Sequence, residues 1–155
     1  MRPYVASLTR HGVAAWAVDV PKGKAERAVA ALLSAVPPAP DVIAGGRSYG
    51  GRVASLAAAQ ARYGGLVLIS YPLHPPGRPD AAEQRTAHWP LISCPVLVLA
   101  GDADPFGRPE LLRSAVATLP TAELVVYPGG RHGLLAEVDD LAGRIADFVA
   151  SLAIA

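Results

Sequence analysis

The sequence lacks the features that would indicate disulfide bonds, secretion or a membrane span. Its 155 residues include one cysteine, so no internal disulfide can form, and the apolar run around Cys94 favours a place in the core over a role as nucleophile. Met1 does not lead into a signal-peptide pattern, and no apolar run approaches the roughly 20 residues that a membrane span needs. We therefore expect a cytoplasmic protein with no membrane partner.

An excess of charge of one sign is also missing. The chain has 14 basic and 13 acidic residues, for a formal net charge of +1, and the basic residues form no stripe of the kind that a phosphate backbone attracts. The four histidines lack the close spacing and the acidic companions of zinc sites. The sequence therefore argues against a nucleic-acid partner, and it predicts neither a metal site nor a cofactor.

Apolar residues, by contrast, are abundant. They make up 52% of the chain against 17% charged residues, and the mean hydropathy is +0.31, which describes a soluble protein with a large interior. A chain of this length buries a sizeable core without disulfide or metal staples, and no linker or repeat divides it. Residues 1–155 are expected to form a single domain.

Short apolar runs alternate with longer stretches of helical periodicity. This alternation predicts an α/β fold, with a mostly parallel sheet of about five strands and helices on both faces. Helices are expected over 25–36, 53–61 and 138–152, and a proline-rich ordered loop over 71–90, with helical turns near 81–87. The expected strands are 14–20, 41–45, 66–70, 95–100 and 123–127.

A Gly-x-Ser-x-Gly pentapeptide, residues 46–50, lies where the second of these strands ends and a helix begins. In that context the pattern predicts a strained turn that exposes the Ser48 hydroxyl at the carboxyl end of the sheet, beside the positive end of a helix. Glycines at 46 and 50 would remove side chains that collide as strand and helix pack. The Tyr49 backbone NH could then stabilise an oxyanion. The alternative is a glycine-rich turn that merely lets the two elements pack.

A serine hydroxyl needs a base, and the base needs an acid that orients it. Where the nucleophilic serine lies in such a strand-to-helix turn, the acid (Asp or Glu) follows it along the chain and the histidine comes last. The loops after the last two expected strands supply Asp104 and His132 in this order. Asp104 is preferred to Asp102 because it lies further beyond the strand end, whereas Asp102 could cap the turn. For His132 the alternative is a surface histidine in a glycine-rich loop.

The proline-rich loop carries side chains that could contact a substrate. We expect His74, Arg78 and Trp89 to line a cleft for a small-molecule acyl substrate. A rigid lid without ligand contacts is an equally open interpretation of this loop.

At these residues the sequence resembles the α/β-hydrolases. It is similar to a small branch, related to dienelactone hydrolases, that includes a testis-expressed protein and a subunit of the non-specific-lethal chromatin complex. The resemblance spans about residues 40–135 and implies a hydrolase in which Ser48, Asp104 and His132 occupy the triad positions. The likeness is carried by the segments 45–52, 71–79 and 101–107.

The resemblance also implies elements that this sequence does not match. Members of the family usually begin with further strands and a His-Gly loop that supplies a second oxyanion donor, but His11-Gly12 follows no apolar strand. We therefore expect a truncated form of the fold. Its sheet either pairs 14–20 directly with 41–45 or is completed by another chain, for example in a homo-oligomer through an exposed sheet edge.

The leading hypothesis is a serine hydrolase that cleaves an ester or thioester through an acyl-enzyme intermediate. The competing hypothesis is a catalytically weak or inactive module of the same fold, which binds a partner through the proline-rich loop or the sheet edge. A peptidase or a lipase is a lesser alternative, and the lack of a large cap argues against the lipase.

Overall fold

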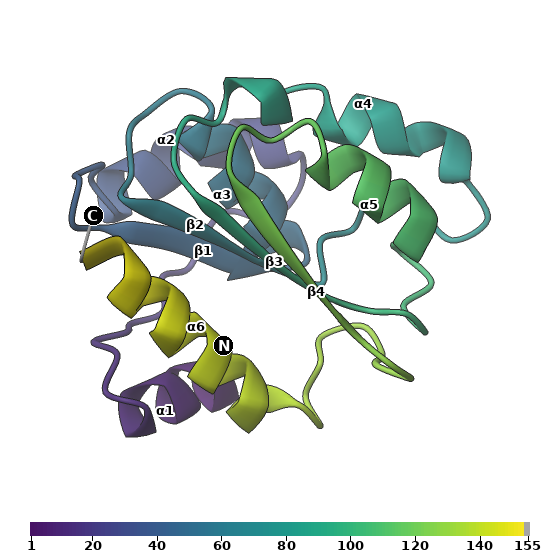
Figure 1. Ribbon diagram of the computed structural model, residues 1–155. Coiled ribbons are helices and arrows are strands. Elements are labelled where there is room, and N and C mark those ends of the chain that lie inside the picture. The colour runs from purple at the N-terminus through teal and green to yellow at the C-terminus, as the bar shows by residue number, and fades with distance from the viewer. Residues whose placement is uncertain (154–155) are drawn as a thin grey trace.

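The computed structural model describes residues 1–153, which are built around a parallel β-sheet (Figure 1). Four strands pair in chain order, each parallel to its neighbour. The inner two are buried along their whole length and the outer two are partly exposed, as expected of a parallel sheet with helices on both faces. The strands are β1 (Ile43–Arg47), β2 (Gly65–Ile69), β3 (Val96–Gly101) and β4 (Ala122–Tyr127).

Helices cover both faces of this sheet (Figure 1). On one face α1 packs against α6, and on the other lie α2, α3 and α5. The predicted α/β fold with a mostly parallel sheet is confirmed, and all three predicted helices form. The helices are α1 (Arg2–Arg10), α2 (Ala25–Ala35), α3 (Tyr49–Ala58), α4 (Ala82–Thr86), α5 (Pro109–Val116) and α6 (Val138–Ala153), with 3₁₀ turns η1 (Pro79–Ala81) and η2 (Trp89–Leu91).

The segment 14–20 was predicted to be the first strand, and this prediction is wrong. The described chain has no strand there, so the sheet has four strands rather than about five. Val18 and Val20 pack against the buried cluster beside α2 and α3, whereas Trp16 is 64% exposed. The apolar pattern therefore reflects packing of two valines without β-pairing. Among the described strands β1 pairs only with β2, and it forms an edge of the sheet.

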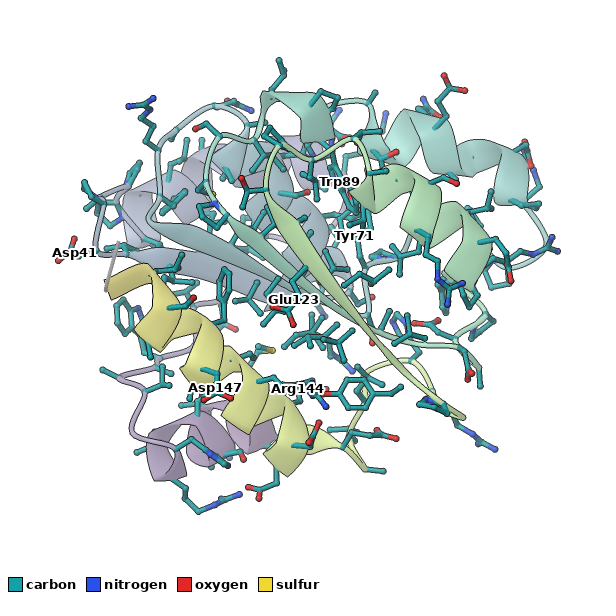
Figure 2. The ribbon with its side chains drawn as sticks, in the orientation of Figure 1. Asp41, Tyr71, Trp89, Glu123, Arg144 and Asp147 are labelled. Carbon is teal, nitrogen blue, oxygen red and sulfur yellow. The ribbon has the colours of Figure 1, made fainter. Side chains whose placement is uncertain are left out.

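Each face of the sheet has its own buried core. The larger one contains Tyr71 and Trp89 from the proline-rich segment, whose rings meet edge to face with centroids 5.0 Å apart (Figure 2). Cys94 belongs to this core and is 7% exposed, as predicted. The smaller core, under α1 and α6, includes Tyr4 and Leu141. No helix within residues 1–153 combines the length and the apolar character needed to cross a bilayer.

Candidate active site

Three loops meet at the carboxyl ends of the strands. Ser48 directly follows β1, Asp104 lies in the loop after β3, and His132 lies in the loop after β4. Since parallel strands all end at the same edge of the sheet, loops from strands that are distant in sequence come together there. We call these three residues the polar cluster.

Ser48 occupies a strained turn between β1 and α3. Its backbone has φ 51° and ψ −118°, a conformation that non-glycine residues rarely adopt. A Cβ added to Gly46 would lie 2.3 Å from the backbone carbon of Gly50, and one added to Gly51 would lie 2.9 Å from the Gly46 oxygen. The sequence predicted a steric need for glycine at 46 and 50. The structure has that need at 46 and 51, whereas an added Cβ at Gly50 meets no atom.

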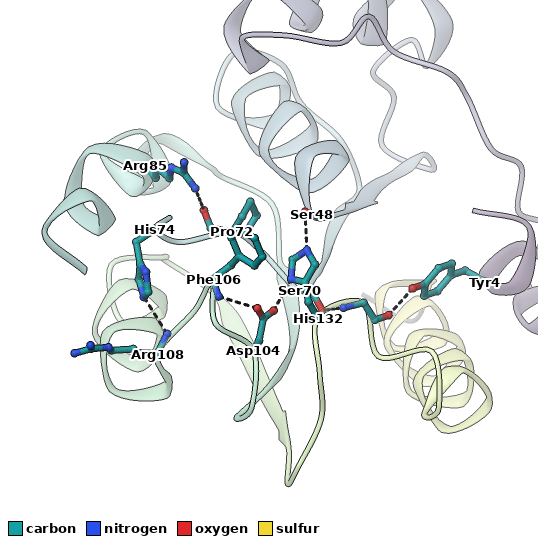
Figure 3. A network of polar contacts seen from close by, with 11 residues as sticks. Tyr4, Ser48, Ser70, Pro72, His74, Arg85, Asp104, Phe106, Arg108 and His132 are labelled. Atoms are coloured by element: carbon teal, nitrogen blue, oxygen red, sulfur yellow. Dashed lines mark hydrogen bonds and ion pairs between the residues drawn. The ribbon is translucent and has the colours of Figure 1, made fainter. Parts of the chain in front are cut away.

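The side chains of the polar cluster form one hydrogen-bonded line (Figure 3). The His132 ring lies between the other two, with Nε2 2.8 Å from Ser48 Oγ and Nδ1 2.7 Å from Asp104 Oδ2. An ionised carboxylate can only accept, so the proton of the neutral ring belongs on Nδ1. Nε2 is then free to accept the proton of the Ser48 hydroxyl.

The two aspartates of the β3 loop have separate partners. The side chain of Asp104 is 3% exposed, and its second oxygen accepts a hydrogen bond from the Phe106 amide at 2.8 Å. Asp102 instead accepts from the Gly129 amide at 2.6 Å. Asp102 therefore ties the β3 loop to the β4 loop, and Asp104 alone of the two contacts His132.

Further contacts fix the loop that carries His132. The adjacent Gly133 donates its amide to Ser70 Oγ at 2.9 Å, and its carbonyl accepts the hydroxyl of Tyr4 from α1 (Figure 3). The Phe106 ring packs beside the imidazole at a centroid distance of 4.7 Å. Sequence reasoning missed Tyr4, Ser70 and Phe106 as supports. Phe106 adjoins the predicted aspartate, but no motif marks Tyr4.

The Tyr49 amide begins α3, so it has no acceptor within the helix. An oxyanion formed at Ser48 would lie next to this donor and to the positive end of the α3 dipole. The Tyr49 hydroxyl points elsewhere and donates to the Pro21 carbonyl at 2.6 Å. Only the backbone of this residue is therefore available to the polar cluster.

Two of the three residues predicted to contact a substrate are buried. Trp89 is 0% exposed and His74 is 1% exposed, so neither has surface to offer a ligand in this conformation. The His74 ring donates to the Pro75 carbonyl, and it accepts from the Arg108 amide (Figure 3). The proline-rich segment that carries them contributes Tyr71, Leu73 and Trp89 to the larger core. Arg78 is exposed and paired with Asp80 at 2.9 Å, and its role in substrate binding stays a prediction.

No group of metal-ligating side chains with a suitable arrangement occurs within residues 1–153. The chemistry that the polar cluster can perform needs none: a hydroxyl aligned with an imidazole and a buried carboxylate can act as an activated nucleophile.

A family model described as an alpha/beta hydrolase domain matches residues 17–146. No curated protein sequence matches the chain.

Several solved structures share the fold. A monoacylglycerol lipase from Paleococcus ferrophilus superposes with a TM-score of 0.81 at 15% identity, over 96% of this chain and 88% of that one. A thermophilic esterase from Thermogutta terrifontis gives 0.60 at 20% identity, over 88% and 75%. Est1E from Butyrivibrio proteoclasticus gives 0.59 at 18% identity, over 72% and 60%. With the family model matching most of the sequence, the chain belongs to the α/β-hydrolase family.

Proposed function

We propose that this protein is a serine hydrolase that cleaves an ester or thioester of a small-molecule acyl substrate. Ser48 Oγ attacks the acyl carbon while His132 Nε2 takes the hydroxyl proton, and Asp104 stabilises the resulting imidazolium. The Tyr49 amide donates to the oxyanion of the tetrahedral intermediate. When this intermediate collapses, the leaving alcohol or thiol takes the proton from His132, and the acyl group stays on Ser48.

The second half of the reaction restores the enzyme. Water attacks the acyl carbon and gives its proton to His132 Nε2, and the new intermediate releases a carboxylic acid as Ser48 Oγ regains the proton. No cofactor takes part in either half.

The observation that carries this proposal is the line from Ser48 Oγ through the His132 ring to Asp104 Oδ2, with distances of 2.8 and 2.7 Å. The strained backbone of Ser48 adds support, because such strain persists only where the surroundings hold it in place. The choice of ester or thioester follows the chemistry of an acyl-enzyme, and the names of two similar structures, a lipase and an esterase, point to the same bond class.

A fluorophosphonate probe tests the proposal. We expect covalent labelling of the wild-type protein, no labelling of Ser48→Ala, and full labelling of Ser34→Ala, an exposed serine on α2. Hydrolysis of p-nitrophenyl acetate and of an acetyl thioester should fall on the order of a thousandfold or more in Ser48→Ala and in His132→Ala. Labelling that survives Ser48→Ala would contradict the assignment of the nucleophile.

The position of β1 at an edge of the sheet, with one partner among the described strands, favours a second candidate function. A strand with one neighbour presents free backbone groups to another chain, so a non-catalytic module or a homo-oligomer could use this edge. Folded wild-type protein that takes no probe and turns over neither ester nor thioester would favour this function. Light scattering would then show whether the partner is a second copy.

A further inference from the structure

A cleft whose lining includes no residue of the polar cluster lies between α2, α3 and α4. Its volume is about 660 Å³, within the range of roughly 300–1,000 Å³ that small-molecule sites occupy. The walls come from the start of α2, the first half of α3, and α4. The cleft is lined by Gly23, Lys24, Glu26, Arg27, Arg52, Gln84 and Arg85.

Positive charge is concentrated in this cleft. Four lining side chains are cationic and one is acidic, which leaves an excess of three positive charges in a chain whose formal net charge is +1. The helix α2 also begins here, at Ala25, so the positive end of its dipole adds to the same field. Like charges gathered in one hollow repel one another, and a bound anion would relieve that repulsion.

The protein's own acceptors satisfy these cations only in part. Glu26 accepts from one terminal nitrogen of Arg52 at 3.3 Å, but the buried Arg52 Nε has no hydrogen-bond partner among the described residues. Arg85 donates to the Pro72 carbonyl at 2.7 Å (Figure 3). Within residues 1–153, no carboxylate forms an ion pair with Lys24, Arg27 or Arg85.

Arg52 acts on two neighbouring groups, although burial has the larger effect on both. Burial and then the nearby Arg52 lower the pKa of Arg85. The same two causes, in the same order, lower the pKa of His88 to about 4. A bound anion would offset the contribution of Arg52 at both positions.

We propose that the cleft binds a phosphate group, either free or on a small organic molecule. Arginine guanidinium groups match phosphate oxygens with paired hydrogen bonds, and lysine adds a compact charge. A phosphate monoester carries roughly −1.5 to −2 charge at neutral pH, which suits an excess of three positive charges better than a single carboxylate does. The site does not require the chemistry of Ser48.

Titration of the full chain, followed by NMR of ¹⁵N-labelled protein, tests the proposal. The probes are inorganic phosphate and phenyl phosphate, at an ionic strength held constant with sodium chloride. We expect saturable binding of at least one probe, with the largest shifts at the amides of Gly23 and Gln84. The double substitution Lys24→Gln with Arg27→Gln removes two exposed cations and should weaken binding roughly tenfold.

Two matched variants complete the experiment. Arg113→Gln removes an exposed arginine of α5 that does not line the cleft, and Ser48→Ala removes the proposed nucleophile; both should bind like the wild type. Tighter binding of phenyl phosphate would identify an organic phosphate as the ligand, and equal or tighter binding of inorganic phosphate would identify the free ion.

Failure to saturate with either probe, or unchanged binding in the double variant, would overturn the proposal. Since ester hydrolysis is measured separately, that failure would leave the proposed function standing.

Discussion

Among single residues, Tyr4 holds the loop of His132 from the opposite end of the chain. Burial raises the pKa of Tyr4, against a smaller lowering by Arg47, so its hydroxyl stays protonated and donates to the Gly133 carbonyl. Tyr4→Phe leaves that carbonyl without its donor. On the proposed mechanism we expect kcat to fall roughly ten- to a hundredfold with KM little changed, because His132 moves relative to Ser48. The free energy of unfolding should fall by about 1–2 kcal/mol.

Tyr63→Phe is the matched control for this prediction. Tyr63 is also buried and donates its hydroxyl to a backbone carbonyl, that of Val36, at 2.8 Å, but it belongs to the core on the other face of the sheet. Urea denaturation should give a similar loss of stability for both variants, and steady-state kinetics should give a lower kcat only for Tyr4→Phe. Equal kcat losses would leave Tyr4 with a structural role alone.

His88 makes stability depend on pH. Burial, and then the charge of Arg52, lower its pKa from 6.5 to about 4. As the pH falls from 6.5 to about 4, the unfolded chain takes up a proton that the folded chain does not, so stability present above this window is lost within it. Allowing for solvent screening of the partly exposed ring, the loss is about 1–2 kcal/mol.

The substitution His88→Gln tests this dependence. Between about pH 7 and pH 4.5, urea denaturation should show the wild type losing about 1–2 kcal/mol more than the variant. An equal loss in both proteins, or a larger one in the variant, would contradict the assignment to His88.

For single residues, the sequence predicts that Ser48, Asp104 and His132 lie close together, but it predicts little about the side chains that surround them. Ser48, Asp104 and His132 each follow a strand, and parallel strand ends share one edge, so their proximity follows from topology. The burial of His74 and Trp89 depends on how one proline-rich segment folds back, which no local pattern specifies. The Tyr4 contact joins positions 129 residues apart, beyond the range of any motif.

At the scale of elements, the turn between β1 and α3 has no space for a side chain at Gly46 but has space for one at Gly50. An alanine at 46 would drive its Cβ to 2.3 Å from the Gly50 backbone, and strand and helix would have to separate. We expect Gly46→Ala to lower the free energy of unfolding by about 3 kcal/mol. Gly50→Ala meets no atom within 4 Å and adds a better helix former, so it should gain up to about 1 kcal/mol.

Chemical denaturation of the two glycine variants measures this contrast within one pentapeptide. A destabilisation of similar size in both would mean that the turn, rather than the approach of β1 to α3, requires glycine.

The spacing of apolar residues predicts the type of some elements correctly and of one segment wrongly. The runs that became β2 and β3 are apolar on both faces, and the helix over 138–152 shows its 3.6-residue pattern clearly, so their types could be predicted. The segment 14–20 has similar apolar content. Its two valines find the core beside α2 and α3, and whether a partner strand lies alongside is a property of the sheet rather than of the segment.

At the scale of the whole molecule, the two cores share one sheet and are expected to unfold together. Leu141 of α6 is 0% exposed in the smaller core, and Leu141→Ala should lower the free energy of unfolding by about 3 kcal/mol. Trp89 lies buried in the other core, whereas Trp16 is 64% exposed, so the fluorescence change reports mainly on Trp89. We expect the fluorescence and circular dichroism transitions to shift equally, because small domains unfold in one step.

Leu135→Ala provides the control for Leu141→Ala. Leu135 is 56% exposed, and its loss should change stability by no more than about 0.5 kcal/mol. Fluorescence that reports an unshifted transition in Leu141→Ala would mean that the two cores unfold separately.

The packing of α1 against α6 orders events during synthesis. The ribosome makes α1 long before α6, yet Ser7 of α1 finds its partner Asp139 at the start of α6. Before α6 is made, the smaller core into which Tyr4 and Leu8 pack is incomplete. Contacts between α1 and α6 also close a long loop, which is slow compared with forming local contacts. The α1 face that meets α6 therefore stays uncovered until α6 is made. On the proposed mechanism, hydrolytic activity should arise only after α6 has left the exit tunnel.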